Sequence, residues 1–379
     1  MHLVLNEDEQ MVRTSCADFL AEQAGPDLLR QLRDSDDPTG YSGELWDKMI
    51  ELGWAGVLID ESFGGLGFSH AGMGQISEYA GSTLASSPLF STAIVGASVV
   101  ALAGSKNHKE SLLPAIASGE MRLALAIDES SRHDPQRVAM TATPSESGYT
   151  LNGQKTFVVD GHVADRLIVA ARTSGQSGES QGITLFLVPY DAEGIEITRS
   201  IMVDSRNAAE IVCSDVHVDQ AAILGSMDEG MTILAAVLDI GNAHLSSELL
   251  GIAVACFDRT LAYLKERTQF GVKIASFQAL QHRAATLWIE IELCKSIVLK
   301  ALRALDASSP DAPLLVSMAK VKTCKIAELA TNEAVQMHGG IGMTDEYDIG
   351  FFMKRARVVQ ALLGDQRYHL NRCAQLSGY

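Results

Sequence analysis

The spacing of apolar positions changes twice along the chain. From Asn6 to about Glu120, apolar residues recur about every three or four positions, as in amphipathic helices. After Arg122 the pattern becomes a series of short β-branched runs separated by Gly, Asn, Ser and Pro, which predicts an all-β segment. From about Met231 the helical period returns, with room for about three or four long helices. The chain is therefore expected to fold as helices, then a β region, then an antiparallel helical bundle.

Short polar motifs mark breaks within this pattern. Asn6 can cap the first helix with Glu9 three residues later, which is a capping-box arrangement. A Gly-Gly pair within Trp54–Gly67 predicts a loop that interrupts the first helical region. The dipeptide Asn152-Gly153 is typical of a tight hairpin turn and predicts one at that point of the β region.

The length of the chain and the two changes of pattern predict its domains. With 379 residues, the chain is long enough for more than one domain with a sizeable core. We expect an N-terminal helical domain at residues 1–121, a small β-barrel or sandwich domain at 122–230 and a C-terminal four-helix bundle at 231–379. The predicted fold class is therefore α+β with three domains.

Charge and composition exclude several classes of function. The formal net charge is −17, whereas a nucleic-acid surface needs clustered Lys and Arg, so we expect no nucleic-acid partner. The apolar run Thr92–Gly104 is shorter than the roughly 20 residues of a membrane span, and the N-terminus has no signal-peptide pattern. We therefore expect a bacterial cytoplasmic protein that does not bind membranes.

The cysteines do not form a metal or disulfide pattern. They lie far apart, without a C-x-x-C pair or a histidine at metal-ligand spacing. The six are Cys16, Cys213, Cys256, Cys294, Cys324 and Cys373. Most lie among apolar residues, so we expect reduced, buried thiols and no metal site.

Two stretches near the C-terminus carry most of the chemistry. They read YLKERTQFGVKIASFQALQHR at Tyr263–Arg283 and QMHGGIGMTDEYDIGFFMKR at Gln336–Arg355. Both resemble the C-terminal domain of the acyl-CoA dehydrogenase family, flavoproteins that oxidise the Cα–Cβ bond of acyl-CoA thioesters. The order of helices, β region and helix bundle is similar to that family over essentially the whole chain. The resemblance implies FAD as cofactor, an acyl-CoA as substrate and electron-transfer flavoprotein as electron acceptor.

The first stretch offers groups suited to a dinucleotide. Arg267 carries a planar, permanently charged fork that matches phosphate oxygens. We expect Phe270 and Gly271 to end that helix with an aromatic wall and a residue tolerant of positive φ. Gln278 can donate and accept hydrogen bonds from the next helix. The alternative is that Arg267 is a solvated helix end.

The second stretch offers close backbone approach. Gln336, Gly339 and Gly340 lie at a predicted helix-to-loop transition, where backbone N–H groups can reach an anion. In the family, the matching positions of both stretches bind the ADP half of an FAD whose flavin lies in a neighbouring subunit. The resemblance therefore implies a homo- or hetero-oligomer, such as a dimer of dimers. The alternative for the two glycines is a plain helix C-cap.

The segments that would contact the flavin ring depart from the family pattern. Where the family has Thr-Glu-Pro and later Trp-Ile-Thr, this chain has a segment starting at Asp128 and Phe157-Val158-Val159. Phe157 can still stack on the ring, but Val159 lacks a hydroxyl and Asp128 adds a carboxylate near an electron-rich ring. This combination resembles one subunit of the heteromeric acyl-CoA dehydrogenases that act on steroid side-chain thioesters.

The general base is missing from both positions that the family uses. Leu363 occupies the usual position and Gly241 the alternative one on the first long helix of the C-terminal domain. Glu248 lies two helical turns beyond Gly241 among apolar residues, and it is either the base or part of a salt bridge or an interface contact. Asp365 is a second candidate base, or it caps the closing helix as a favoured N-cap residue.

The substrate side of the pattern is also altered. Asp239 matches a family position near the thioester, whereas Asn242 replaces an arginine that usually anchors the substrate. The sequence predicts an acyl-CoA dehydrogenase of fatty-acid or steroid side-chain catabolism. A non-catalytic partner subunit that completes the FAD site of a dissimilar subunit is the main alternative. Nitroalkane oxidation on the same fold is a third.

Overall fold

The structure is a computed structural model that describes residues 3–379, and within it the chain forms two compact units. One unit contains the N-terminal residues up to Asp34 together with His70–Ser86 and Asn242–Tyr379. The other contains Ser35–Ser69 and Ser87–Gly241. Each unit is therefore assembled from segments that are distant in the sequence.

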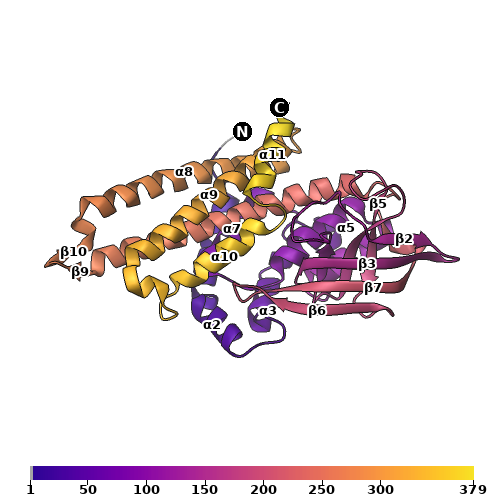
Figure 1. Ribbon diagram of the computed structural model, residues 1–379, viewed down its shortest axis with the longest axis horizontal. Coiled ribbons are helices and arrows are strands. Elements are labelled where there is room, and N and C mark those ends of the chain that lie inside the picture. Colours follow the sequence, from indigo (N-terminus) through magenta and orange to yellow (C-terminus); the bar gives the residue numbers. More distant parts are fainter. Residues whose placement is uncertain (1–2) are drawn as a thin grey trace. The chain divides into compact units, whose positions relative to one another are not determined.

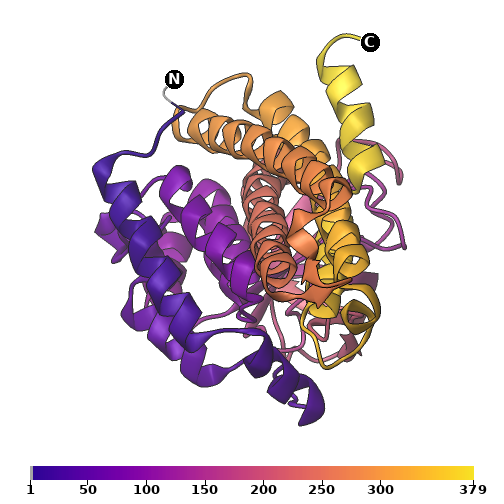
Figure 2. The same ribbon diagram turned by 90° about the vertical axis from the view of Figure 1, so that its left-hand side faces the viewer.

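The first unit is helical. Long helices α8 and α9 pack against each other, and α9 also packs against α10 and α11 (Figures 1 and 2). The N-terminal helices pack as α1 on α4 and α4 on α8. The bounds are α1 Glu7–Gln23, α2 Pro26–Asp34, α4 His70–Thr83, α7 Gly230–Glu266, α8 Gln278–Asp306, α9 Ala312–His338, α10 Ile349–Ala361 and α11 Gln366–Leu376.

The helices of the bundle follow their apolar pattern and their caps. On α8 the buried side chains recur at helical spacing, at Leu287, Ile291, Cys294, Val298 and Ala301. The predicted capping box at the start of α1 is confirmed. The Asn6 side chain accepts from the Glu9 N–H at 2.8 Å, and the Glu9 carboxylate accepts from the Asn6 N–H at 2.9 Å.

Helix α7 passes from one unit to the other, because the division falls after Gly241. Among the described residues it is the one helix that is long and apolar enough to cross a membrane. However, 83% of the apolar window that meets this criterion is buried inside the protein, and the core helix of a soluble protein passes the same test.

The second unit combines a mixed sheet with short helices. The strands follow the order β6-β7-β3-β2-β4-β5-β8, and β1 pairs with β4 in parallel. The strands are β1 Leu123–Ala126, β2 Thr141–Pro144, β3 Gly148–Val159, β4 Arg166–Arg172, β5 Ile183–Pro189, β6 Ile195–Ile201, β7 Asn207–Asp219 and β8 Ile223–Leu224. The helices are α3 Gly43–Glu51, η1 Trp54–Gly56, η2 Glu61–Phe63, the π-helix η3 Leu89–Gly96, α5 Ala97–Ala103, α6 Lys106–Ala117 and η4 Gln220–Ala222. The predicted succession of helices, β region and helix bundle is therefore confirmed.

The hairpin turn predicted at Asn152-Gly153 is wrong. Both residues lie inside β3, where the pairing with β7 shifts by one position between Leu151 and Gly153. Gly153 has φ 142°, and a Cβ there would lie 2.9 Å from Met140. The extra residue of this β-bulge lies in β7, where Ser214 and Asp215 oppose Asn152 alone, and Gly153 lies beside it in β3. The pairing of β3 with its neighbours overrides the local turn signal.

Residues 3–379 contain neither a candidate metal site nor a disulfide. No group of three or more His, Cys, Asp or Glu side chains there could hold a metal ion, and the six cysteines are free.

Candidate functional site

A small apolar cluster joins the two stretches that the sequence singles out. Leu264 near the end of α7, Ile274 in the short helix η5 (Ile274–Ser276) and Met337 near the end of α9 pack together. Tyr263 and Leu280 pack around them. The ends of α7 and α9 and the start of α8 are therefore fixed beside one another, at the end of the bundle marked by β9 (Thr268–Gln269) and β10 (Val272–Lys273) in Figure 1.

Polar and ring contacts strengthen this junction. The Tyr263 hydroxyl donates to the His338 carbonyl at 3.3 Å, and the two rings lie 4.4 Å apart. His338 immediately precedes Gly339. Tyr263 lies one helical turn before Arg267, whose N–H donates to the Tyr263 carbonyl. The contact therefore places the predicted phosphate-binding arginine next to the predicted glycine loop.

The predicted polar ligands lie exposed around this junction. Arg267 follows the last residue of α7, Gln278 is the first residue of α8, and Gln336 lies in the last turn of α9. All three side chains are exposed. The structure thus brings together three residues that the sequence separates by up to 69 positions, as a shared ligand would require.

Phe270 and Gly271 do not end a helix, so that part of the prediction is wrong. Helix α7 ends at Glu266. The two residues form the two-residue turn of a β-hairpin made by β9 (Thr268–Gln269) and β10 (Val272–Lys273). Both have positive φ, 53° and 80°, as a type I′ turn requires. The Phe270 ring is 91% exposed, which leaves it available to a ligand or a neighbouring subunit.

The two glycines after α9 leave open space. Gly339 ends α9 with φ 64°, and no atom lies within 4 Å of the position that a Cβ would occupy on Gly339 or on Gly340. Their backbone can therefore be approached closely by a phosphate or ribose. With the exposed Arg267, this cradle fits the ADP half of FAD.

The residues predicted to contact the flavin ring belong to the other unit. Phe157 has φ 57° at an irregularity of β3, and its side chain is 36% exposed, so its ring is accessible. Asp128 follows β1, and its Oδ2 accepts from His133 Nδ1 at 2.9 Å. Beside it, Glu129 pairs with the buried Lys155 at 2.7 Å. The sequence did not reveal that the Asp128 carboxylate has a histidine partner.

The structure holds the backbone at the usual base position in place. Leu363 has φ 53°, and its carbonyl accepts from Asn242 Nδ2 at 3.1 Å and from His369 Nε2 at 3.2 Å. The preceding carbonyl, of Leu362, accepts from Lys320 Nζ at 2.7 Å. These donors fix the turn between α10 and α11.

Lys320 was missed by the sequence interpretation. It is fully buried, and its Nζ also donates to Asn242 Oδ1 at 3.1 Å. Burial lowers its pKa from 10.5 to about 8, against smaller opposing effects of the nearby Cys324 and Glu248. A signal was present, because Lys320 lies on the apolar stripe of α9 between Val316 and Cys324.

Glu248 lies in a buried ion pair. Its Oε1 accepts from Arg355 Nε at 2.7 Å, and the two residues are 7% and 4% exposed. This is the salt bridge that the sequence left open as an alternative, and a partner 107 residues away could not be read from the pattern. The role of Glu248 as base stays a prediction.

Asp365 acts as the cap that the sequence offered as its alternative role. Its side chain accepts from the Tyr368 N–H at 2.8 Å at the start of α11. Asp239, the predicted substrate residue, is buried on α7, and its role stays a prediction.

Asp365→Ala is expected to lower the free energy of unfolding by about 1 kcal/mol, because the first turn of α11 loses its side-chain acceptor. Urea unfolding measures this change. Turnover per bound flavin should stay within about twofold of wild type, since a cap takes no part in proton transfer. A loss of turnover beyond about 100-fold in folded protein would instead assign the proton transfer to Asp365.

Comparison with known proteins identifies the family. Models of the N-terminal, middle and C-terminal domains of acyl-CoA dehydrogenase match residues 6–120, 125–219 and 228–377. The chain is 31% identical to the probable acyl-CoA dehydrogenase YngJ of Bacillus subtilis, over 95% of each chain. It is 29% identical to the caffeyl-CoA reductase-Etf complex subunit CarC of Acetobacterium woodii, over 94% of each chain.

Among solved structures, the Tcur3481-Tcur3483 steroid ACAD superposes with a TM-score of 0.87 at 27% identity, over 98% of each chain. The family models together match most of the chain, and their order follows the helical, β and helical regions of the fold. The chain belongs to the acyl-CoA dehydrogenase family and is an FAD-dependent oxidoreductase of that family.

Proposed function

We propose that the protein oxidises the Cα–Cβ bond of an acyl-CoA thioester to give the 2,3-enoyl-CoA. The observation that carries this proposal is the junction of α7, α8 and α9. It gathers Arg267, Gln278 and Gln336 around the open glycine pair at one end of the bundle. Four separate features of one nucleotide-binding pattern meet there, which a chance grouping of helix ends would not produce.

The junction would hold the ADP half of FAD, with Arg267 on the pyrophosphate and the backbone of Gly339 and Gly340 beside it. Phe270, at the exposed hairpin tip, would form the apolar wall. Phe157 would lie against the isoalloxazine of an FAD shared with a neighbouring subunit. FAD, when bound, supplies the acceptor for the hydride that leaves Cβ.

The oligomer and the electron acceptor follow from the same pattern. In the family, the matching residues bind an FAD whose flavin lies in a neighbouring subunit, so the working unit would be a dimer or a dimer of dimers. The similarity to CarC, a subunit of a complex with Etf, supports an electron-transfer flavoprotein as the partner. Because CarC is a reductase by name, the reaction is to be assayed in both directions.

The substrate would be the CoA thioester of a fatty acid or of a steroid side chain, handled in the bacterial cytoplasm. The similarity to a steroid acyl-CoA dehydrogenase supports the second class. Asp239 on α7 would contribute to thioester binding.

Of the two carboxylates considered as base, Glu248 is the stronger candidate. Asp365 already serves as a helix cap, whereas Glu248 is a buried carboxylate inside the helical bundle. Arg355 Nε donates to Glu248 Oε1 at 2.7 Å and would hold that carboxylate in one orientation.

A second function is supported by the same ion pair. An arginine that holds Glu248 in place, with Leu363 at the usual base position, is also what a non-catalytic subunit would retain. Such a subunit would complete the FAD site of a dissimilar partner.

Flavin binding tests the proposal. The isolated chain is expected to purify as a yellow protein containing FAD, and Arg267→Gln is expected to weaken FAD binding about 10- to 100-fold, because a charge-assisted hydrogen bond to phosphate is lost. Fluorescence titration of the apoprotein with FAD measures the change. Arg357→Gln removes an exposed arginine that pairs with Glu328 on the same bundle and serves as control.

A colourless chain that gains flavin only when produced with a second subunit would favour the partner role. Equal FAD affinity of wild type and Arg267→Gln would contradict the assignment of the junction.

A further inference from the structure

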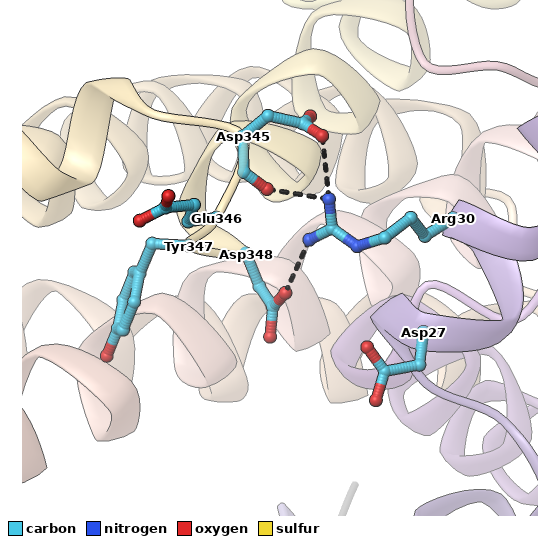
Figure 3. Close-up of a pocket in the computed structure, with 6 residues that line it drawn as sticks. All are labelled: Asp27, Arg30, Asp345, Glu346, Tyr347 and Asp348. Carbon is cyan, nitrogen blue, oxygen red and sulfur yellow. Dashed lines mark hydrogen bonds and ion pairs between the residues drawn. The ribbon is translucent and has the colours of Figure 1, made fainter. Parts of the chain in front are cut away.

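The loop that follows the nucleotide-binding glycines is held by arginines from two other helices. Arg30 on α2 donates through Nη1 to the backbone carbonyl of Asp345 at 2.6 Å and to its carboxylate at 2.8 Å. Its Nη2 donates to the Asp348 carboxylate at 3.3 Å. Figure 3 shows the guanidinium of Arg30 lying between these two aspartates, with its contacts dashed. One side chain thus spans residues 345–348.

Two further arginines complete the arrangement, which we call the arginine clamp: Arg30, Arg33 and Arg259 with Asp345 and Asp348. Arg33 binds both carboxylate oxygens of Asp345, at 2.7 and 3.0 Å. Arg259 on α7 binds Asp348 at 3.1 Å. Asp345 therefore receives two guanidinium groups from α2, and Asp348 receives one from α2 and one from α7.

The clamp also has an apolar base. The guanidinium carbons of Arg30 and Arg33 lie 4.8 and 5.2 Å from the centre of the Phe351 ring at the start of α10. Arg259 lies 5.1 Å from the Phe352 ring. Flat contacts of this kind restrict the arginine side chains, so less freedom is lost when they bind the loop.

The clamp is connected to the nucleotide-binding junction through Tyr347, which lies between the two aspartates. Its ring is 4.7 Å from that of His338 and 6.2 Å from that of Tyr263. His338 precedes the glycine pair, and Tyr263 donates to its carbonyl. A loop that is fixed at Asp345 and Asp348 therefore also fixes the rings that support the glycines.

The last turns of α7 connect the clamp with the nucleotide site. Arg259 and Tyr263 lie four residues apart, so their side chains share one face of the helix. Arg267 is the first residue after the helix, and its N–H donates to the Tyr263 carbonyl. Arg259 contacts the clamp, Tyr263 contacts the glycine loop, and Arg267 is the proposed phosphate ligand. The clamp and the nucleotide site are thus neighbours along one helix.

The clamp borders an open cleft of about 620 Å³, lined by Asp27, Arg30, Asp345, Glu346, Tyr347 and Asp348. The side chains of Arg30 and Asp345 are 24% and 58% exposed to solvent. Ion pairs that face water in this way are screened by salt. The strength of the clamp should therefore depend on ionic strength.

We propose that Arg30, with Arg33 and Arg259, is a positioning residue for the cofactor, holding the loop from Gly339 to Tyr347 in the conformation that binds the nucleotide half of FAD. The proposal rests on the proposed function, because it assigns that loop to the cofactor. Arg30 itself would not contact FAD. Its effect would reach FAD through the loop alone.

Measuring both FAD affinity and turnover distinguishes a positioning role of Arg30 from a general contribution to folding. Arg30→Gln is expected to weaken FAD binding of the apoprotein about 5- to 10-fold, as for the loss of a network of partly exposed ion pairs. Turnover at saturating FAD is expected to stay unchanged. Hydrogen exchange of the amides of residues 339–347 in the apoprotein is expected to become faster, while that of α8 is not.

Two further variants sharpen the test. Arg30→Lys keeps the charge but cannot reach two carboxylates and a carbonyl with a planar fork, so it is expected to restore only part of the affinity. Arg357→Gln, which removes the exposed ion pair with Glu328, should leave FAD affinity unchanged. Raising the salt concentration should weaken FAD binding more in wild type than in Arg30→Gln.

The outcomes distinguish the two levels of the proposal. Wild-type apoprotein that does not bind FAD under any of these conditions would overturn the proposed function. Wild type that binds FAD while Arg30→Gln binds it equally well, with unchanged hydrogen exchange in the loop, would overturn the clamp alone.

Discussion

Replacing Glu248 by glutamine is expected to lower the rate of enoyl-CoA formation about 100- to 10,000-fold, because an amide cannot accept the α-proton that a positioned carboxylate would take. Stopped-flow reduction of the bound flavin by acyl-CoA measures the step directly, apart from electron transfer to the acceptor protein. FAD content should be unchanged, since Glu248 lies roughly 27 Å along α7 from the helix end that precedes Arg267. Normal flavin reduction in the variant would remove Glu248 as the base.

The variant needs a control for stability. Glu248→Gln leaves Arg355 buried without its carboxylate, and breaking a buried ion pair costs roughly 3 to 5 kcal/mol of folding free energy. The double variant Glu248→Gln with Arg355→Met removes both charges and is expected to recover a large part of that loss. It should remain as inactive as Glu248→Gln. Turnover could instead fall in Glu248→Gln and recover in the double variant together with the free energy of unfolding. The ion pair would then be structural, and the partner-subunit function would be favoured.

The free energy of unfolding of wild type is expected to rise with pH relative to that of Lys320→Met. Burial lowers the pKa of Lys320 to about 8 in the folded protein, against 10.5 for a free lysine. Between these values the unfolded chain binds more protons than the folded one, so the free energy of unfolding rises with pH. The contribution of Lys320 is then lost as the pH falls towards 8. The full change is on the order of 3 kcal/mol.

Urea unfolding of both proteins at a series of pH values from 7 to 10.5 measures this effect, and titrations common to the two proteins cancel in the difference. Lys325→Met removes an exposed lysine from the same helix and controls for the change in net charge. Below pH 8, Lys320→Met loses the hydrogen bonds to the Leu362 carbonyl and Asn242 but avoids burying a charge, so the two effects partly offset each other. A difference that is constant over the whole range would contradict a lowered pKa.

Lys320 also helps to hold the turn at Leu363 in place. The lysine, Asn242 and His369 together donate to two consecutive carbonyls of the turn between α10 and α11. Asn242 does so from the position where the family usually has an arginine for the substrate. The side chain of Asn242 thus contacts both the Leu363 carbonyl and Lys320.

The parts of the site that were predicted correctly depend on short stretches of sequence. Asn6 and Glu9 form the capping box, Asp365 caps α11, and Gly271 has positive φ. In each case the residue type and its immediate neighbours decide the conformation. The helix end expected at Phe270 was wrong, because Phe270 and Gly271 form a turn between two strands that are too short to show an apolar pattern.

The sequence by itself determined the order of helices, strands and bundle, the family, and the residues offered to the nucleotide, because periodicity and motif spacing are properties of neighbouring positions. Only the tertiary structure decided the partners of the buried charges: Arg355 for Glu248, the Leu362 carbonyl for Lys320, and His133 for Asp128. It also decided that Gly153 lies within a strand, opposite a β-bulge in β7. The reason is physical: a buried charge or a strand register is set by whichever groups packing brings within about 3 Å, and their separation along the chain leaves no trace in local pattern.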